Sequence, residues 1–305
     1  MQTAIKLQPG TDAWHAERKL GIGGSECAAV LGLSKWATPF DIYQNKIGES
    51  EPQDETWEMA RGHAMEPLLR QYFADTTGLE VSLPNSAIVH PKYPFMRYNP
   101  DGLCTGKILA EYKTASYGRE WGDAGTDEIP QEYILQVQHG LACLDYEVAK
   151  ASVSIGGSKP KYYEIPADKE LQEMIIEGEA AFWHKVQNRI VPDPISNADV
   201  SRMYSRVNGQ SIEITPEIMQ ALQELRVIRR LMKEEEEAKE KLEVTIKSFM
   251  GANEILVDEF MVPVITWKAA KGAHRIDSDR LKSEQPAIAA EYTKIGDPTR
   301  RFLVK

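Results

Sequence analysis

The spacing of hydrophobic positions changes several times along this chain of 305 residues, and each spacing predicts a different element. Apolar residues recur every three or four positions over 54–77, 130–146 and 168–190, which predicts three amphipathic helices. Short extended segments are predicted over 79–98, and a strand pair over 149–167. The order of helices, sheet, helix, sheet and helix predicts an α/β core.

The carboxy-terminal third has a different pattern. Residues 215–250 predict one long helix with an apolar stripe and the polar run KEEEEAKEK in its middle. We interpret that run as a solvated face, because the apolar pattern is too short and too broken at Glu235 and Ala238 to indicate an extended coiled coil. A hairpin is predicted within 254–269.

A proline-rich turn, Pro192-Asp193-Pro194, precedes a polar stretch and marks the predicted domain boundary. We therefore expect a domain over 1–195, a linker over 196–211 and an α+β extension over 212–305. The chain length suits one large domain with an appendage or two modest domains.

The stretch from Pro100 to Lys113 predicts a β-hairpin that brings two carboxylates together. Asp-Gly and Thr-Gly are turn dipeptides, and KILAEYK alternates as a strand does. Asp101 and Glu111 are equidistant from Gly106, so a turn centred there places them opposite each other, with Cβ atoms about 4.5–5.5 Å apart. Such a pair repels unless a cation intervenes, and Mg²⁺ and Mn²⁺ prefer oxygen ligands. The pair is a candidate metal site, with Lys113 on the face of Glu111.

The glycine-rich loop GIGGS, at 21–25, precedes a predicted short helix that Ser25 can cap. Free N–H groups at a helix start bind anions, and Arg18 and Ser25 could add a guanidinium and a hydroxyl. The alternative is a tight turn that packs two helices.

Two other helical positions also have two interpretations each. Glu66 precedes Arg70 by one turn, and on its own this pair indicates a solvated ion pair. Gln136 and Gln138 bracket Val137 on an apolar helix side, so this helix either borders a polar cleft or is half-exposed in the ordinary way.

Composition narrows the classes of protein. Cys27, Cys104 and Cys143 are widely spaced and include no CxxC, which argues against a disulfide framework, a zinc knuckle and an iron–sulfur cluster, and favours a reducing cytoplasm. We expect a soluble protein, because we find neither a signal peptide nor a run of about eighteen apolar residues.

The excess acidic charge lies in the first two thirds of the chain. Residues 1–202 carry 19 Lys and Arg against 29 Asp and Glu, whereas 203–305 carry 17 of each. A broad basic face for nucleic acid is therefore excluded, and DNA binding would need a local basic channel or a protein that encircles its substrate.

Five blocks of sequence together carry a family resemblance. They are DAWHAERKLGIGGSE at 12–26, RGHAMEPLL at 61–69, PDG at 100–102, EYK at 111–113 and YILQVQHGL at 133–141. With these blocks in this order, the chain resembles the lambda exonuclease-like, YqaJ-type viral recombinase nucleases of the PD-(D/E)XK superfamily. The resemblance implies a central mixed β-sheet flanked by helices, with a carboxy-terminal extension.

The same resemblance implies roles for individual residues. Asp101, Glu111 and the backbone carbonyl of Tyr112 would bind Mg²⁺ or Mn²⁺, and Glu66 would reach the metal directly or through water. Lys113 would orient or deprotonate the attacking water and offset charge on the scissile phosphate.

A second group of residues would position the substrate. Gln136 would face the nucleophile or the phosphate, and Arg18 with Ser25 would form the pocket for a terminal 5′-phosphate. Gly24 would adjoin that pocket, whose shape depends on Gly23 and Gly24 because some relatives have bulkier residues there.

The function implied is a metal-dependent exonuclease that degrades the 5′-ended strand of linear duplex DNA for phage-type recombination in the bacterial cytoplasm. A trimeric ring and a single-strand annealing protein as partner are implied in the same way. The alternatives are a structure-specific or restriction-type endonuclease on the same fold, and a non-catalytic recombination assembly protein.

Overall fold

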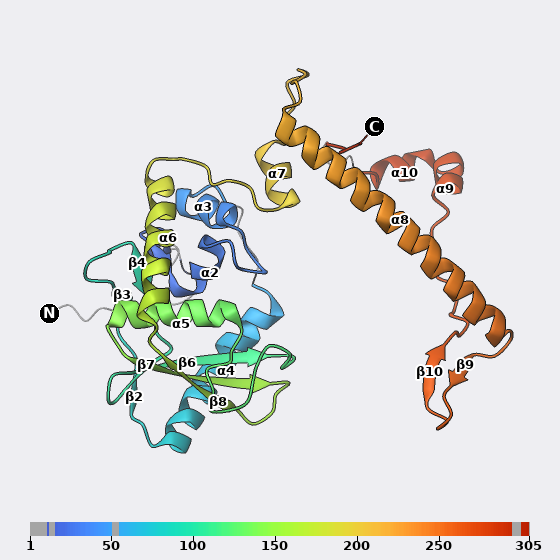
Figure 1. Cartoon of the computed structure of the whole chain (residues 1–305). Helices are drawn as coiled ribbons and strands as arrows, with labels where there is room; N and C mark the ends of the chain where they lie inside the picture. The colour runs from blue at the N-terminus through green and yellow to red at the C-terminus, as the bar shows by residue number, and fades with distance from the viewer. Residues whose placement is uncertain (1–10, 12–15, 51–54, 295–299, 305) are drawn as a thin grey trace. The chain divides into compact units, whose positions relative to one another are not determined.

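The computed structural model describes residues 11, 16–50, 55–294 and 300–304, and within them the chain divides into two compact units, Met1–Tyr204 and Ser205–Lys305 (Figure 1). The division falls inside the stretch where we expected a linker. Residues 12–15, which begin the first of the five sequence blocks, lie outside the described residues.

A five-stranded mixed sheet forms the centre of the amino-terminal unit. Its strand order is β2-β5-β6-β7-β8; β6 and β7 are parallel and the other pairs are antiparallel. This confirms the α/β class and the strand pair expected near 149–167. The strands are β2 (Val81–Ser82), β5 (Gly102–Cys104), β6 (Ile108–Ala115), β7 (Val148–Ile155) and β8 (Lys161–Pro166).

The hairpin β5–β6 has the register that the turn dipeptides predict. Gly102 pairs with Ala110 and Cys104 with Ile108. Gly106 has a φ of 81°, a left-handed conformation that a residue with a Cβ rarely adopts. The register places Asp101, one residue before β5, at the position facing Glu111.

The two faces of the sheet are covered by different helices, as the alternation in β6 requires. Helix α4 (Trp57–Thr77) packs Phe73 against Tyr112 on one face. Helix α5 (Gln131–Leu144) covers the other face, where Leu109 is fully buried. The predicted helices over 54–77 and 130–146 are thus confirmed.

Most of the remaining elements of this unit pack against α5. A small sheet of order β1-β4-β3 lies beside it, and α6 packs against it. The two-residue strand β1 lies where we expected only a glycine loop. These elements are β1 (Ile22–Gly23), a 3₁₀ turn (Gly24–Glu26), α2 (Cys27–Val30), α3 (Pro39–Ile47), β3 (Ile88–Val89), β4 (Met96–Tyr98) and α6 (Lys169–Gln187).

The stretch expected to be a linker contains a short helix, α7 (Asn197–Met203). Asp199 is fully buried, accepts a hydrogen bond from the Thr38 hydroxyl at 2.9 Å and pairs with Arg202 at 2.8 Å. These contacts fasten α7 to the start of α3, so the first half of that stretch belongs to the amino-terminal unit.

The carboxy-terminal unit is built on the long helix α8 (Pro216–Met250), which confirms the helix predicted over 215–250. The Thr215 hydroxyl caps its first turn and Gly251 ends it. The predicted hairpin follows, and two short helices complete the unit. These elements are β9 (Ile255–Val257), β10 (Pro263–Thr266), α9 (Ser278–Glu284) and α10 (Pro286–Glu291). None of the helices in the described ranges of the chain is long and apolar enough to cross a bilayer.

Candidate active site

Asp101 and Glu111 lie side by side because of the hairpin. The backbone N–H of Tyr112 donates to the Asp101 carboxylate at 2.9 Å, which ties the residue before β5 to the middle of β6. The N–H and C=O of one strand residue point to the same side, so the Tyr112 carbonyl also points toward Asp101. Glu111 is 1% exposed. The three oxygen donors predicted from the sequence therefore lie on one side of the strand.

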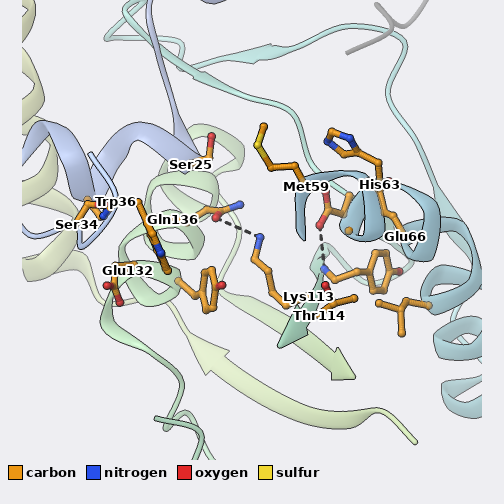
Figure 2. A pocket seen from close by; sticks show the side chains of 16 residues that line it. Ser25, Ser34, Trp36, Met59, His63, Glu66, Lys113, Thr114, Glu132 and Gln136 are labelled. Carbon is orange, nitrogen blue, oxygen red and sulfur yellow. Dashed lines mark hydrogen bonds between the residues drawn. The ribbon is translucent and has the colours of Figure 1, made fainter. Parts of the chain in front are cut away.

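Glu111 is held by side chains from three elements. Tyr98 Oη on β4 donates to Glu111 Oε2 at 2.6 Å, and Lys113 Nζ donates to Oε1 at 2.5 Å. The Gln136 amide on α5 also donates to Oε1, and its own oxygen accepts from Lys113 at 3.3 Å (Figure 2). Gln136 therefore borders the polar site, which was one of the two interpretations of its helix.

Tyr98 was missed by the sequence analysis, because nothing in the spacing of its strand separates a buried hydroxyl donor from an ordinary core residue. Its ring lies between two glycines. A Cβ on Gly24 would lie 2.7 Å from the ring, and one on Gly140 would lie 2.5 Å from it. Both distances are shorter than atoms tolerate, so glycine at 24 and 140 lets the ring reach Glu111.

Glu66 forms the expected ion pair with Arg70 on α4, and Arg70 Nε also donates to the backbone carbonyl of Asp101 at 3.1 Å. The pair is therefore part of the wall around Asp101. Glu66 lines the cavity next to Asp101 (Figure 2).

Arg18 and Ser25 also reach this region, but their local contacts differ from the prediction. Gly23, and not Ser25, is the N-cap of the 3₁₀ turn, and its N–H donates to the Glu26 carboxylate at 2.8 Å. Ser25 consequently lies inside the turn with its side chain exposed. Glu26 pairs with Arg18 and with the fully buried Lys46, both at 2.6 Å.

The candidate residues line two adjoining cavities, of about 440 and 220 Å³. Ser25, Asp101, Lys113 and Gln136 line both. The larger cavity is also lined by Glu66 and Tyr112, and the smaller one by Arg18, Gly24 and Glu111. The structure therefore brings all nine predicted site residues together.

Gln138 does not belong to the site. It is 2% exposed and points to the other side of α5, where its amide donates to the Pro166 carbonyl at 2.7 Å and its oxygen accepts from the Asp168 N–H at 3.0 Å. Residues two apart on a helix differ by about 200° in direction, so only one of the two glutamines faces the cavity.

The electrostatics of the site favour a bound cation. Burial and the negative charge of Glu111 raise the pKa of Asp101 above its usual range. Burial opposes the charged form of Lys113, but Glu111 and Asp101 outweigh it and raise the pKa of the lysine, so its ammonium stays charged at neutral pH. One ammonium offsets only part of the charge of two or three carboxylates.

The donor set fits Mg²⁺ or Mn²⁺. Asp101, Glu111 and the Tyr112 carbonyl supply oxygen atoms from one side, the cavity leaves room for water, and Glu66 lies nearby. Hard divalent ions prefer carboxylate and carbonyl oxygens and retain several waters.

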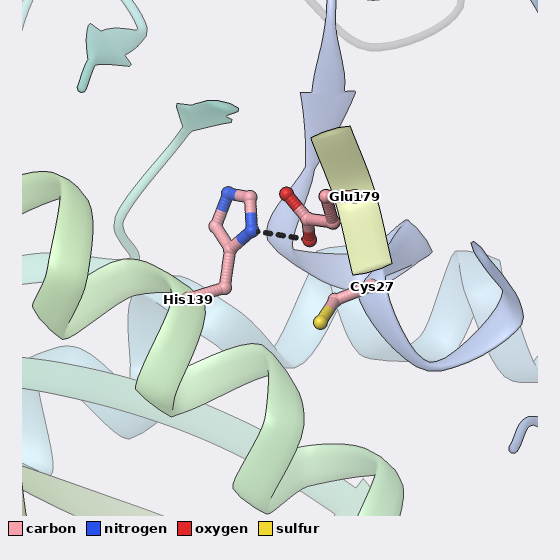
Figure 3. A group of neighbouring side chains, drawn as sticks. All are labelled: Cys27, His139 and Glu179. Carbon is pink, nitrogen blue, oxygen red and sulfur yellow. Dashed lines mark hydrogen bonds and ion pairs between the residues drawn. The ribbon is translucent and has the colours of Figure 1, made fainter. Parts of the chain in front are cut away.

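A second polar cluster lies behind the site and was not predicted from the sequence (Figure 3). His139 Nδ1 lies 2.8 Å from Glu179 Oε1 on α6, and Nε2 lies 3.1 Å from the carbonyl of Arg97 on β4. Ligand atoms of His139, Glu179 and Cys27 all lie within 4.8 Å of one another, and all three residues are buried.

We interpret this cluster as a buried ion pair rather than a metal centre. Burial alone would lower the pKa of His139, but the charge of Glu179 and contacts with the Cys143 and Cys27 thiols raise it well above its ordinary value. Both ring nitrogens then donate hydrogen bonds and have no lone pair for a metal. Burial raises the pKa of Cys27 to about 12, so this thiol stays neutral.

The mixed sheet, with α4 and α5 on opposite faces and the Asp, Glu-x-Lys cluster on its central hairpin, defines a PD-(D/E)XK fold. The YqaJ-like viral recombinase domain matches residues 13–147. The uncharacterized protein YqaJ of Bacillus subtilis is 34% identical over 309 residues, which cover 96% of this chain and 94% of that protein. The chain therefore belongs to the YqaJ-like viral recombinase family, which confirms the resemblance.

Among solved structures, an alkaline exonuclease from Laribacter hongkongensis shares the fold. It superposes with a TM-score of 0.50 at 22% identity, over 64% of this chain and 98% of that chain. This match confirms the predicted PD-(D/E)XK architecture.

Proposed function

We propose that this protein is a Mg²⁺- or Mn²⁺-dependent exonuclease that degrades the 5′-ended strand of linear double-stranded DNA. The observation that carries the proposal is the convergence of Asp101, Glu111 and Lys113 with Arg18 and Ser25 on two adjoining cavities. Family membership and the fold shared with an alkaline exonuclease support it.

The reaction is hydrolysis of a phosphodiester bond. A water oxygen forms a bond to phosphorus and the bond to the 3′-oxygen breaks, which releases a nucleoside 5′-monophosphate and leaves a new 5′-phosphate on the shortened strand. Asp101, Glu111 and the Tyr112 carbonyl would hold the divalent ion, which would supply an acidified water and stabilise charge on the phosphate oxygens.

The protein side chains position the reactants. Burial opposes the charged form of Lys113, but Glu111 and Asp101 raise its pKa, so we assign this lysine to holding the attacking oxygen and offsetting phosphate charge. Gln136 and Tyr98 fix the Glu111 carboxylate by hydrogen bonds. Rigid placement of charge before the reaction is the largest contribution in many enzymes.

Arg18 and Ser25 bind the terminal 5′-phosphate in the smaller cavity. A guanidinium with a hydroxyl suits a phosphate dianion, and Glu26, which also pairs with Lys46, holds the Arg18 side chain in place. Each turnover creates a new 5′-phosphate, so the same pocket serves every cycle.

The overall acidity of the chain is consistent with retention of DNA by enclosure. A formal net charge of −10 does not favour a broad electrostatic interface with phosphates. A ring of subunits around the duplex, with an annealing protein that takes up the exposed strand, fits a role in phage-type recombination in the bacterial cytoplasm.

The test uses three DNA substrates: a linear duplex with 5′-phosphates, the same duplex with 5′-hydroxyls, and a covalently closed circle, each with Mg²⁺ or a chelator. We expect Mg²⁺-dependent loss of the phosphorylated linear duplex, and none with Glu111→Ala. Arg18→Ala is expected to remove the preference for the 5′-phosphate, while the neighbouring exposed charge variant Lys19→Ala keeps it.

Each other outcome rejects a part of the proposal. Cleavage of the circle indicates an endonuclease on the same fold. Cleavage that starts at 3′ ends rejects the polarity. If folded wild-type protein cuts none of the substrates with either metal, the site is a scaffold and the assembly role replaces the enzymatic one.

A further inference from the structure

Helix α8 carries an apolar seam that stays largely exposed within the described part of its own unit; of its large apolar residues, Leu225 is half-buried. Taking Ile218 as position a of a heptad, positions a and d fall on one side of the helix over five heptads. Six apolar side chains of this seam are between 37% and 77% exposed, a large apolar surface for a single helix. They are Ile218, Ile228, Met232, Leu242, Ile246 and Phe249.

Two charged residues interrupt the seam at its centre. Glu235 occupies a d position and Lys239 the next a position, one helical turn apart. Read along one chain, they break the heptad pattern; Glu235 is one of the two breaks, with Ala238, that together with the short length of the pattern argued against an extended coiled coil in the sequence. Their charges are opposite, however, and they lie near the middle of a helix that spans 216–250.

With opposite charges at its centre, the seam of one copy is complementary to the seam of a second copy only when the two helices run antiparallel. Consider two antiparallel copies of α8 aligned so that Glu237 of one copy lies level with Glu237 of the other. Glu235 of each copy then faces Lys239 of the second copy. The same register places Met232 against Leu242 of the second copy. The break in the single-chain pattern thus becomes two inter-chain ion pairs.

The rest of the seam between Leu225 and Phe249 agrees with this register, whereas Ile218 lies beyond the paired part of the helix. Ile228 meets Ile246 of the second copy, and Leu225 meets Phe249 of the second copy, so every one of these layers is apolar. At the flanking e positions, Arg229 lies opposite Glu243 of the second copy. Residues at e and g set the partner and orientation in coiled coils.

A parallel pair is disfavoured by the same residues. In a parallel pair with the two helices in register, Glu235 would face Glu235 of the second copy, and Lys239 would face Lys239 in the adjacent layer. Like charges across an interface oppose association, and polar residues at seam positions select one arrangement over another. The seam therefore favours one occupant, a second copy of this chain, in one orientation.

We propose that α8 is a self-association site, at which two copies of this chain form an antiparallel coiled coil centred on the Glu235–Lys239 ion pairs. The helix is about 52 Å long at 1.5 Å per residue. Paired in this way, it joins two amino-terminal units through a two-fold axis. The inference does not depend on the proposed nuclease activity.

The first test is a charge exchange in the full-length chain, read out as molar mass by sedimentation. In a pair of Glu235→Lys chains, four lysines meet at the centre of the coiled coil; in a pair of Lys239→Glu chains, four glutamates meet there. Each variant is therefore expected to have half the wild-type mass, with an affinity between copies at least about tenfold weaker. The double variant restores both ion pairs and the wild-type mass. Mixing the two single variants restores association as well.

The matched control is Glu237→Lys. This residue lies on the outer side of α8, so the variant makes the same charge change on the same helix but leaves the seam intact, and it is expected to keep the wild-type mass. Circular dichroism checks that each variant retains its helices.

The second test determines the relative orientation of the two α8 helices in chains that keep Glu235 and Lys239. The three native cysteines are buried, so a short bis-maleimide reacts with introduced thiols. We expect a mixture of Met232→Cys and Leu242→Cys chains to cross-link to each other, because those positions share a layer. Cross-linking of Met232→Cys chains to themselves would indicate a parallel pair and overturn the proposal.

Two further results would also overturn it. If both charge reversals leave the mass at the wild-type value, the seam does not join copies. If the wild-type protein is a monomer, the seam also does not join copies, and hydrogen exchange then identifies what covers it. Protection of the seam at all protein concentrations points to the amino-terminal unit of the same chain. An unprotected seam points to a different protein.

Discussion

The two units use charged residues in opposite ways. In the amino-terminal unit, several charged side chains are buried and pair with residues from distant segments; the side chains of Lys46 and Glu26 are 0% and 5% exposed. In the carboxy-terminal unit, α8 carries local ion pairs such as Lys247 with Glu243, which are 45% and 47% exposed. Among its described residues, only Met250 and Ala289 are buried apolar residues.

This difference separates a unit that is held together by tertiary contacts from one that is held largely by a single helix. Buried charges lose a large part of their hydration and contribute only when every partner is in place, whereas exposed pairs contribute little. Site chemistry therefore belongs to the first unit, and the second has an apolar surface available for association.

The largest expected effect is at the site carboxylates. Asp101→Asn should lower nuclease activity on the order of a thousandfold, the scale of losing a preorganised electrostatic group. It should also stabilise the fold by about 1 kcal/mol in chelator, because the raised pKa of Asp101 means that its ionised form opposes folding at neutral pH. An activity assay measures the loss of nuclease activity, and urea unfolding measures the change in the free energy of unfolding.

The control for this variant is the exposed carboxylate of Glu164, which pairs with Lys150 at the surface. Glu164→Gln should leave both activity and stability nearly unchanged. An Asp101→Asn protein that is less stable than wild type in chelator would contradict the view that the two site carboxylates repel.

The next largest effect is expected at the Glu26–Lys46 pair. Lys46→Met leaves a buried carboxylate with only Arg18 as a cationic partner, and should lower the free energy of unfolding by about 3–5 kcal/mol. Burial alone would raise the pKa of Glu26, but Lys46, Arg18 and the Gly23 N–H lower it. The wild type should therefore lose this contribution as the pH falls through the lowered pKa, and the variant should lose less.

A double variant with apolar residues at both positions should recover much of the lost stability, because it removes the unpaired charge as well. If Lys46→Met lowers the free energy of unfolding no more than the control Lys150→Met, at a half-exposed lysine, the Glu26–Lys46 pair does not behave as a buried one.

A smaller and pH-dependent effect is expected at His139. Its pKa is raised in the folded state, so its contribution is complete below the unfolded value of about 6.5 and declines as the pH rises toward the folded pKa, by up to 1.4 kcal/mol per pH unit. The His139→Gln variant should lack this slope, so the difference in unfolding free energy between wild type and variant should decline as the pH rises. The exposed His184→Gln should retain the slope, and equal slopes for wild type and His139→Gln would show that the imidazole is neutral.

The smallest effect is expected on α8. Lys247→Ala removes an exposed pair one turn apart and should change stability by no more than about 0.5 kcal/mol, as measured by far-UV circular dichroism of chemical unfolding. A loss above about 2 kcal/mol would mean that the charges of α8 take part in tertiary contacts, and the contrast between the units would fail.

The parts of the fold that the sequence predicted correctly depend on local patterns. The hairpin register follows from a turn at Gly106 and alternation along β6, and α8 follows from its cap, its stripe and Gly251. Asp101, Glu111 and Lys113 came together in the prediction because ten or twelve residues of local structure bring them together.

Contacts between distant segments could not be predicted in this way. Tyr98 reaches Glu111 only because β4 belongs to a separate small sheet that packs on α5, and Glu179 lies 40 residues from His139. The N-cap at Ser25 was wrong because the Glu26 side chain bonds to Gly23 instead, with Lys46 as the buried partner. The roles of the site residues in chemistry stay predictions.

The tyrosine ring between Gly24 and Gly140 has a consequence for how the family varies. The three positions share one volume, so a side chain at 24 or 140 fits only where the ring at 98 is replaced by something smaller. Such a replacement removes the donor to Glu111, and another group must then supply it. Across related sequences, positions 24, 98 and 140 should therefore change together, and chains with a bulky residue at 24 should hold the glutamate at position 111 by a different hydrogen bond.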